Sequence, residues 1–234
     1  YPNRSVMDGA FSVVVDGVQT SLHASRRAPA DRTDLEVTPL RVQVDEPLQR
    51  LSVLVGANDS GITAQLAFEA RTVACEEPRF VQRGGGNRVV FDYTRLTQFG
   101  TWSGWIDIAG TRVDVGGALG SRDRSWGVRP VGERTPEPPG PLPQFFWLWA
   151  PVNFADICTH FDVQEDSAGL RWHHNGVMLP AADSGHGGGF DPSGPGGEAM
   201  TDVDWDITWR PGTRRADRAS IRLTPASGEP VTIV

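Results

Sequence analysis

Apolar and polar residues alternate with a period of two along most of this chain, and this pattern limits the possible folds more than any other feature. The alternation is clearest in four segments: 10–18, 35–44, 51–55 and 62–70. A β-strand places successive side chains on opposite faces, so such segments are typical of half-buried strands. No segment has the 3.6-residue spacing and the capping residues of a long amphipathic helix. The sequence therefore predicts an all-β protein.

Turn residues separate the predicted strands. Asp16-Gly17 and the segment Asn58–Gly61 each follow an alternating segment, and 103–115 is typical of a hairpin that turns at Ala109-Gly110. The 27 glycines and 18 prolines of the chain can supply many such turns. This spacing favours meandering antiparallel strands in a barrel or a sandwich.

Composition excludes several classes of protein. The chain is 38% hydrophobic, which is enough to build a buried core, and its net charge of -7 excludes a nucleic-acid surface. All 22 basic residues are Arg, so neither a Schiff-base lysine nor a phosphate-loop lysine is possible. Cys75 and Cys158 lack the spacing of a zinc or redox motif. The absence of an apolar run long enough to span a bilayer predicts no integral membrane segment, and with no secretory leader we expect a cytoplasmic protein.

The organisation of the chain changes near residue 100. All eight Trp residues lie between Trp102 and Trp209, where they could form a large core or line a pocket. A proline-rich segment, 130–143, and a glycine-rich segment, 185–197, are predicted to be exposed loops or linkers, and either could act as a lid.

One short segment combines a carboxylate with several cations. In Gly120–Arg129, Asp123 lies among Arg122, Arg124 and Arg129. Charges this close in sequence are either solvated or paired with one another. Asp123 could therefore be an acid catalyst, a structural counter-ion or part of a binding wall, and ion-pair networks are the most common of these arrangements.

Alternation on a regular strand would separate Asp123 from its basic neighbours. Asp123 and Ser125 would share one face, and Arg122, Arg124 and Trp126 would share the other. If Asp123 faces the interior, burial raises its pKa and an acid role is possible. If a bulge turns the arginines inward, a charge-balanced binding wall explains the segment better.

Two further segments supply candidate pocket residues. In the aromatic run 145–150, alternation would place Phe145, Trp147 and Trp149 on one face, as core or as the wall of an apolar ligand pocket. His160 and Asp162 share one side of the predicted strand 156–163, where they could orient a ligand or move a proton.

A metal site is not predicted. His173-His174 could meet His160 and Asp162 across a hairpin, but the four residues have no recognised ligand spacing, and we expect no metal and no other cofactor.

The segments 93–107 and 120–129 resemble the domain junction of the carotenoid hydratase (hydroxyneurosporene synthase) and AttH group of bacterial proteins. The signature of that group is an Asp shortly before an aromatic-Gly pair, matched here by Asp123, Trp126 and Gly127. The resemblance implies two tandem lipocalin-like domains, 1–118 and 119–234. From the abrupt start at Tyr1 and the apolar alternation 230–234 at the other end, we expect the chain to be truncated at both ends and the second domain to be incomplete at the C-terminus. The sequence departs from the group at Arg122 and Arg124, where the hydratases have Trp and His around the Asp.

The resemblance also implies a reaction without metal, flavin or nucleotide. Asp123 would protonate an alkene or polarise a carbonyl, and aromatic faces would stabilise the cation. Independently of the resemblance, His160 is the second catalytic candidate, because it could orient the ligand or move a proton. The predicted ligand wall comprises Trp102, Trp105, Arg122, Arg124, Trp126, Arg129, Trp147, Trp149 and Asp162.

Two functions stay open. The chain could be a cofactor-independent hydratase, isomerase or cyclase for a hydrophobic isoprenoid or polyketide-like molecule, or a non-catalytic lipocalin-like binding protein for an apolar ligand. A hydrophobic small molecule is the expected partner in both cases, and the sequence makes no prediction of oligomeric state.

Overall fold

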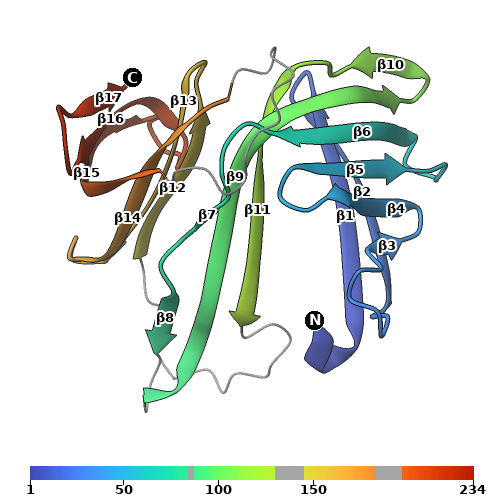
Figure 1. The fold of residues 1–234 in the computed structure, drawn as a ribbon, viewed down its shortest axis with the longest axis horizontal. Coiled ribbons are helices and arrows are strands. Elements are labelled where there is room, and N and C mark those ends of the chain that lie inside the picture. The colour runs from blue at the N-terminus through green and yellow to red at the C-terminus, as the bar shows by residue number, and fades with distance from the viewer. Residues whose placement is uncertain (84–86, 130–144, 183–196) are drawn as a thin grey trace. The chain divides into compact units, whose positions relative to one another are not determined.

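The computed structural model describes residues 1–83, 87–129, 145–182 and 197–234. They form one short 3-10 helix, η1 (Pro2–Arg4), and seventeen β-strands, and the strand pairs with an assigned register are antiparallel (Figure 1). The predicted all-β class, with curled, lipocalin-like sheets, is confirmed.

Contacts divide the chain into two compact units. The first unit contains 1–70 and 100–120, and the second contains 71–99 and 121–234. The strands β9 (Val89–Ile108) and β11 (Ala118–Val128) run through both units. Residues 71–99 therefore belong to the second unit, although they precede the domain boundary that the sequence suggests between 118 and 119.

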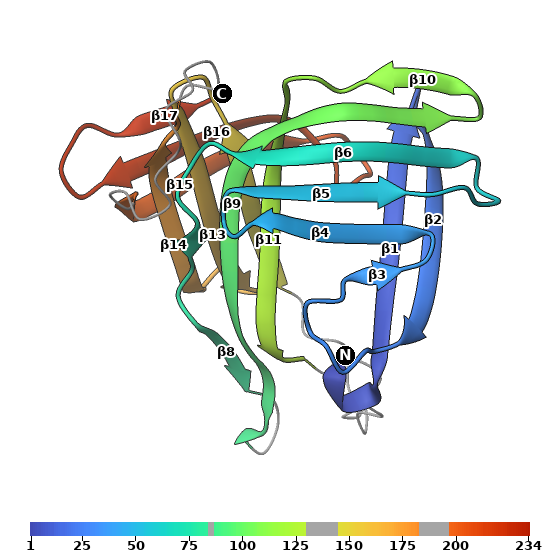
Figure 2. The same ribbon diagram turned by 45° about the vertical axis from the view of Figure 1, so that its right-hand side comes forward.

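The first unit is a sheet covered on one face by a hairpin. Its own strands are β1 (Val6–Val15), β2 (Val18–Arg27), β3 (Glu36–Val37), β4 (Leu40–Glu46), β5 (Arg50–Val55), β6 (Ile62–Ala70) and β10 (Thr111–Asp114). The sheet has the order β10-β9-β6-β5-β4-β3, and the β1–β2 hairpin crosses it (Figure 2). Phe11 and Leu22 of the hairpin pack on Leu40, Val55 and Leu66 of the sheet. These apolar contacts hold the hairpin against the sheet.

The turns explain where the first unit agrees with the sequence pattern and where it differs. Asp16-Gly17 and Ala109-Gly110 have positive φ at both residues, as the tight turns of hairpins require. The predicted strand 35–44 is instead two strands, β3 and β4, which pair with each other around Thr38-Pro39. Pro39 has no N–H to donate to a strand ladder, so the alternating segment is interrupted there.

The second unit contains a six-stranded meander, two short strands and parts of β9 and β11. Its strands are β7 (Cys75–Glu76), β8 (Phe80–Arg83), β12 (Phe145–Asn153), β13 (Ile157–Asp166), β14 (Arg171–Pro180), β15 (Glu198–Trp209), β16 (Ala216–Pro225) and β17 (Val231–Ile233). In the meander, β12 to β16 each pair with the next strand, whereas β7, β8 and β11 pair with β9.

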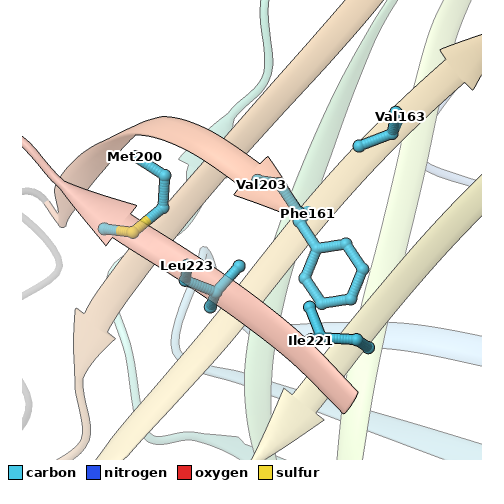
Figure 3. Packing of buried hydrophobic residues seen from close by; sticks show 6 residues of the cluster. All are labelled: Phe161, Val163, Met200, Val203, Ile221 and Leu223. Atoms are coloured by element: carbon cyan, nitrogen blue, oxygen red, sulfur yellow. The ribbon is translucent and has the colours of Figure 1, made fainter. Parts of the chain in front are cut away.

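Strand β13 is buried on both faces. Its apolar face packs into a core that includes residues from strands two and three places away in the sheet, which shows that the meander curls on itself. Figure 3 shows this core, which consists of Phe161, Val163, Met200, Val203, Ile221 and Leu223. The opposite face carries Cys158, His160, Asp162 and Gln164, all at most 5% exposed. A strand with a buried polar face needs polar partners on the element that covers it.

Some predicted features are not described by the structure. The proline-rich segment 130–143 and residues 185–196 of the glycine-rich segment lie outside the described residues. Within the described ranges, no helix is long and apolar enough to cross a membrane.

Gly127, the glycine of the Trp126-Gly127 pair, lies where β11 and β9 approach each other closely. Its φ is +139°, and an added Cβ would lie 2.6 Å from the Cα of Tyr93 and closer still to the carbonyl oxygen of Asp92. Gly127→Ala should therefore lower the free energy of unfolding by about 2 kcal/mol or more. Urea denaturation of the purified proteins measures the change.

Gly228→Ala is the matched control for this substitution. The nearest atom to its added Cβ is Pro225 Cγ at 3.8 Å, and its φ lies outside the strained range. We expect a change within about 0.5 kcal/mol. Equal effects of the two substitutions would contradict the close-approach explanation.

Candidate functional site

A buried arginine, Arg95 on β9, is the centre of a charge cluster in the second unit. Its side chain is 6% exposed, and its Nη1 donates a hydrogen bond to Glu77 Oε2 at 3.3 Å. Nη1 is also 3.6 Å from Asp162 Oδ2, and Nε is 3.9 Å from Asp123 Oδ1. A guanidinium is stable at such depth only with counter-charges around it. We call Arg95, Glu77, Asp123 and Asp162 the Arg95 cluster.

Strand alternation brings these side chains together. On β9, Tyr93, Arg95 and Thr97 occur at every second position and so point to one side of the strand. On β13, His160 and Asp162 belong to the polar face opposite the apolar core. The contacts between Arg95 and Asp162 show that these two faces meet.

Glu77 and His160 form the deepest part of the site. Glu77 is 4% exposed and accepts a hydrogen bond from Thr97 Oγ1 at 2.7 Å. Burial raises the pKa of the Glu77 carboxyl, an effect that Thr97 and Arg95 partly oppose. The imidazole of His160 is fully buried, with Nε2 3.4 Å from Glu77 Oε1, and burial lowers its pKa to about 4. His160 is therefore neutral at neutral pH.

Asp123 occupies a more open position than Glu77. Its side chain is 46% exposed, and partial burial raises its pKa, whereas the nearby charges of Arg95 and Arg129 act in the opposite direction. Its neighbour Arg122 donates instead to Gln98 Oε1 at 3.5 Å. Gln98 and Arg95 are three residues apart on β9, so their side chains point to opposite sides of the strand. Asp123 and Arg122 therefore contact opposite sides of β9.

A pocket of about 290 Å³ lies beside the Arg95 cluster. Five aromatic and four polar residues line it: Phe80, Phe91, Tyr93, Trp147 and Trp172, with Gln82, Arg95, Arg129 and Gln164. An apolar wall with a few polar groups is the usual composition of a small-molecule site.

The cluster and the aromatic wall hold each other in place. The Arg95 guanidinium carbon lies 5.6 Å from the Tyr93 ring centre, 5.8 Å from that of Trp147 and 5.5 Å from that of Trp149. Trp147 Nε1 donates to Asp162 Oδ1 at 2.7 Å. The guanidinium thus lies near electron-rich rings as well as carboxylates, and both stabilise its positive charge in the interior of the protein.

The structure brings together some of the residues that the sequence suggested. Around Arg95 it places Asp123, Arg129, Trp147, Trp149, His160 and Asp162. Phe145, predicted to share their face, has a side chain that is not described.

Five candidates lie elsewhere. Trp102 packs against Phe68 in the first unit, with ring centres 5.2 Å apart, and Trp105 stacks with Arg112 in the same unit. Arg122, Arg124 and Trp126 are not among the residues that line the pocket.

Sequence reasoning missed the residues that build the centre of the site: Glu77, Phe80, Phe91, Tyr93, Arg95, Gln164 and Trp172. The sequence of β9 contains one signal. Arg95 and Thr97 lie on one side of this strand, and Gln98 lies on the other, so both sides carry polar residues. Such a strand lacks an apolar face over those residues, which indicates a polar interior. No group of three or more His, Cys, Asp or Glu side chains within the described ranges could hold a metal ion.

The fold and the site define a class: an all-β chain with curled sheets and an aromatic pocket over a buried ion-pair cluster. A family of unknown function (DUF8625) matches residues 1–234, and the chain belongs to this family. No curated protein and no solved structure matches the chain. The resemblance to the carotenoid hydratase group stays a prediction.

His160 should make the stability of the protein depend on pH. Its pKa is about 4 in the folded protein against 6.5 as the ordinary value, so below pH 6.5 the unfolded chain takes up a proton that the folded chain does not. Between pH 7.5 and pH 5 this difference removes about 2 kcal/mol of stability. His160→Leu should lose about 2 kcal/mol less than the wild type over that interval.

Urea denaturation of both proteins at the two pH values measures the effect. All other titratable groups are common to the two proteins, so the contributions of those that do not interact with His160 cancel in the comparison. Parallel losses of stability in wild type and His160→Leu would show that the imidazole is not buried in its neutral form.

Proposed function

We propose that the second unit binds a small hydrophobic molecule in the pocket beside the Arg95 cluster. The observation that carries this proposal is the lining itself, in which five aromatic side chains surround a pocket of about 290 Å³. The exposed fraction of Trp147 is 50%, so a large part of this indole is open to a ligand. Aromatic surfaces of this kind stabilise flat apolar molecules by burial and by ring stacking.

Removal of one wall of the pocket should weaken binding. Trp147→Leu keeps an apolar side chain but removes the indole, and we expect about tenfold lower affinity for the hydrophobic molecules that the wild type retains. Incubation with a hydrophobic metabolite extract of the source organism, followed by native mass spectrometry, identifies those molecules, and titration gives their affinities.

Trp209→Leu is the control for this substitution. Trp209 is similarly exposed, at 44%, but does not line the pocket. It should bind the same molecules as the wild type does. If wild type retains nothing, or if both variants bind equally well, the pocket is not the binding site.

A second candidate function is cofactor-independent acid catalysis on the bound molecule, as hydration, isomerisation or cyclisation. The observation in its favour is that burial raises the pKa of two carboxyl groups, Glu77 and Asp123, that both contact Arg95. A carboxyl with a raised pKa can hold a proton closer to neutral pH and donate it to an alkene or a carbonyl. Asp123 is the candidate donor because it is open enough to exchange protons with solvent.

Asp123→Asn separates catalysis from binding. The amide has nearly the shape of the carboxyl but cannot donate a proton as an acid, so we expect turnover to fall at least a hundredfold while ligand affinity changes little. Mass spectrometry of the incubated extract detects products that are heavier by one water or altered only in retention time.

Asp59→Asn, the same change in an exposed turn of the first unit, should leave turnover intact. Ligands that bind to wild type and to both variants without conversion would leave the protein as a carrier. Equal turnover by wild type and Asp123→Asn would exclude Asp123 as the proton donor.

A further inference from the structure

Two polar residues that line the pocket, Gln164 and Arg95, indicate which chemical groups a ligand could carry. Gln164, on the polar face of β13, is 5% exposed and lines the pocket next to Arg95. We infer that the ligand is a compact, flat molecule with a neutral carbonyl group, and that Gln164 and Arg95 bind the carbonyl oxygen. This inference rests on the proposed binding function and specifies the class of molecule.

Gln164 lacks a polar partner in the described part of the chain. Its amide atoms are not among the fully buried polar atoms that lack a partner, so the amide, with two N–H donors and one acceptor oxygen, faces the open space of the pocket. A buried amide without a partner is unfavourable, and most buried polar groups in native proteins are paired. A hydrocarbon that displaced solvent from the pocket would leave this amide unpaired, whereas an oxygen-bearing ligand would accept a hydrogen bond from it.

Arg95 can donate to the same oxygen. Nη1 faces Glu77 and Asp162, and Nη2 donates to the hydroxyl of Tyr93 at 3.1 Å. A guanidinium has five N–H groups, and Nη2 carries two of them. One Nη2 hydrogen therefore has no acceptor within the described residues, in a side chain that lines the pocket.

The charges around Arg95 favour a neutral acceptor over an anion. Three carboxyl groups, those of Glu77, Asp123 and Asp162, already lie within 4 Å of this guanidinium. The carboxyl groups of the cluster thus outnumber its one guanidinium before any ligand binds. A carboxylate ligand would add a further negative charge beside Asp162 and Asp123, which is unfavourable at this depth. A carbonyl accepts the same hydrogen bonds without that repulsion.

The shape of the pocket limits the carbon skeleton. Its volume of about 290 Å³ is at the lower end of the range for small-molecule sites. The rings of Phe80 and Tyr93 lie 5.0 Å apart and tilted, and those of Phe80 and Trp172 lie 5.5 Å apart. Rings at these spacings contact one another and form one continuous wall, and the volume of the pocket suits one or two fused rings conjugated with the carbonyl rather than a long polyene.

Three naphthalene probes of similar size test this inference. 2-Acetonaphthone has the carbonyl, 2-ethylnaphthalene has nearly the same shape without oxygen, and 2-naphthoate has a negative charge. Equilibrium dialysis against the full chain, with chromatographic quantitation, gives the three affinities. We expect the ketone to bind at least tenfold more tightly than either of the other probes.

Gln164→Leu tests the role of the amide and retains an apolar side chain of comparable volume. The variant breaks no hydrogen bond within the described residues, so it should fold, and circular dichroism checks this. We expect the preference for the ketone over the hydrocarbon to fall at least threefold. Gln65→Leu, the same change at an exposed position of β6 in the first unit, should keep the preference of the wild type.

The outcomes distinguish this inference from the proposed function. Equal binding of ketone and hydrocarbon, tighter binding of the naphthoate, or an unchanged preference in Gln164→Leu would overturn the carbonyl inference and leave a hydrophobic pocket in place. Failure of all three probes to bind would count against the proposed binding function, and the inference would fall with it.

Discussion

The second unit depends on one physical constraint, which is the burial of the Arg95 guanidinium. A buried cation without partners is unstable by several kcal/mol, so its position requires Glu77 and Asp162 to be buried as well. These side chains come from β9, from the residue that follows β7, and from β13, so the ion pairs fix how three separate parts of the chain meet. Removal of either carboxylate would leave the guanidinium with too few counter-charges, at a cost of about 3–5 kcal/mol, which is similar to that of truncating a large side chain in an apolar core.

The same constraint explains why aromatic residues surround the cluster. The face of an aromatic ring stabilises a buried cation, and the indole N–H of Trp donates a hydrogen bond to a buried carboxylate, so neither charge needs a further ionic partner. Trp147 does both, because its ring lies beside Arg95 and its Nε1 donates to Asp162. The rings that satisfy the cluster are also the wall of the pocket. The cluster therefore holds this wall of the pocket in place. Because these side chains are already ordered, less conformational entropy is lost when a ligand binds.

The sequence predicts the strands of this protein better than its site, and the reason is physical. Strand alternation and turns such as Ala109-Gly110 depend on neighbours in the chain, so the all-β class could be predicted. The segment 120–129 also identified Asp123 and Arg129, because its charges are adjacent in sequence. Arg95, Glu77 and Gln164 are far apart in sequence and become a cluster only through the pairing of distant strands. No local pattern specifies that the chain segment 71–99 joins the second unit, so the centre of the site could not be predicted.

Asp123 and Glu77 have environments too different for one role. Neither carboxyl lines the pocket, and both contact Arg95, which does. Glu77 is buried against His160, so it cannot readily exchange a proton with solvent. Asp123 is half-exposed and contacts the Nε side of the same guanidinium. Since an acid catalyst has to regain its proton after each turnover, the exposed group suits that role in the proposed reaction. Glu77 then keeps Arg95 in place, and the guanidinium connects the two carboxyls, so a change in the protonation of one is felt by the other.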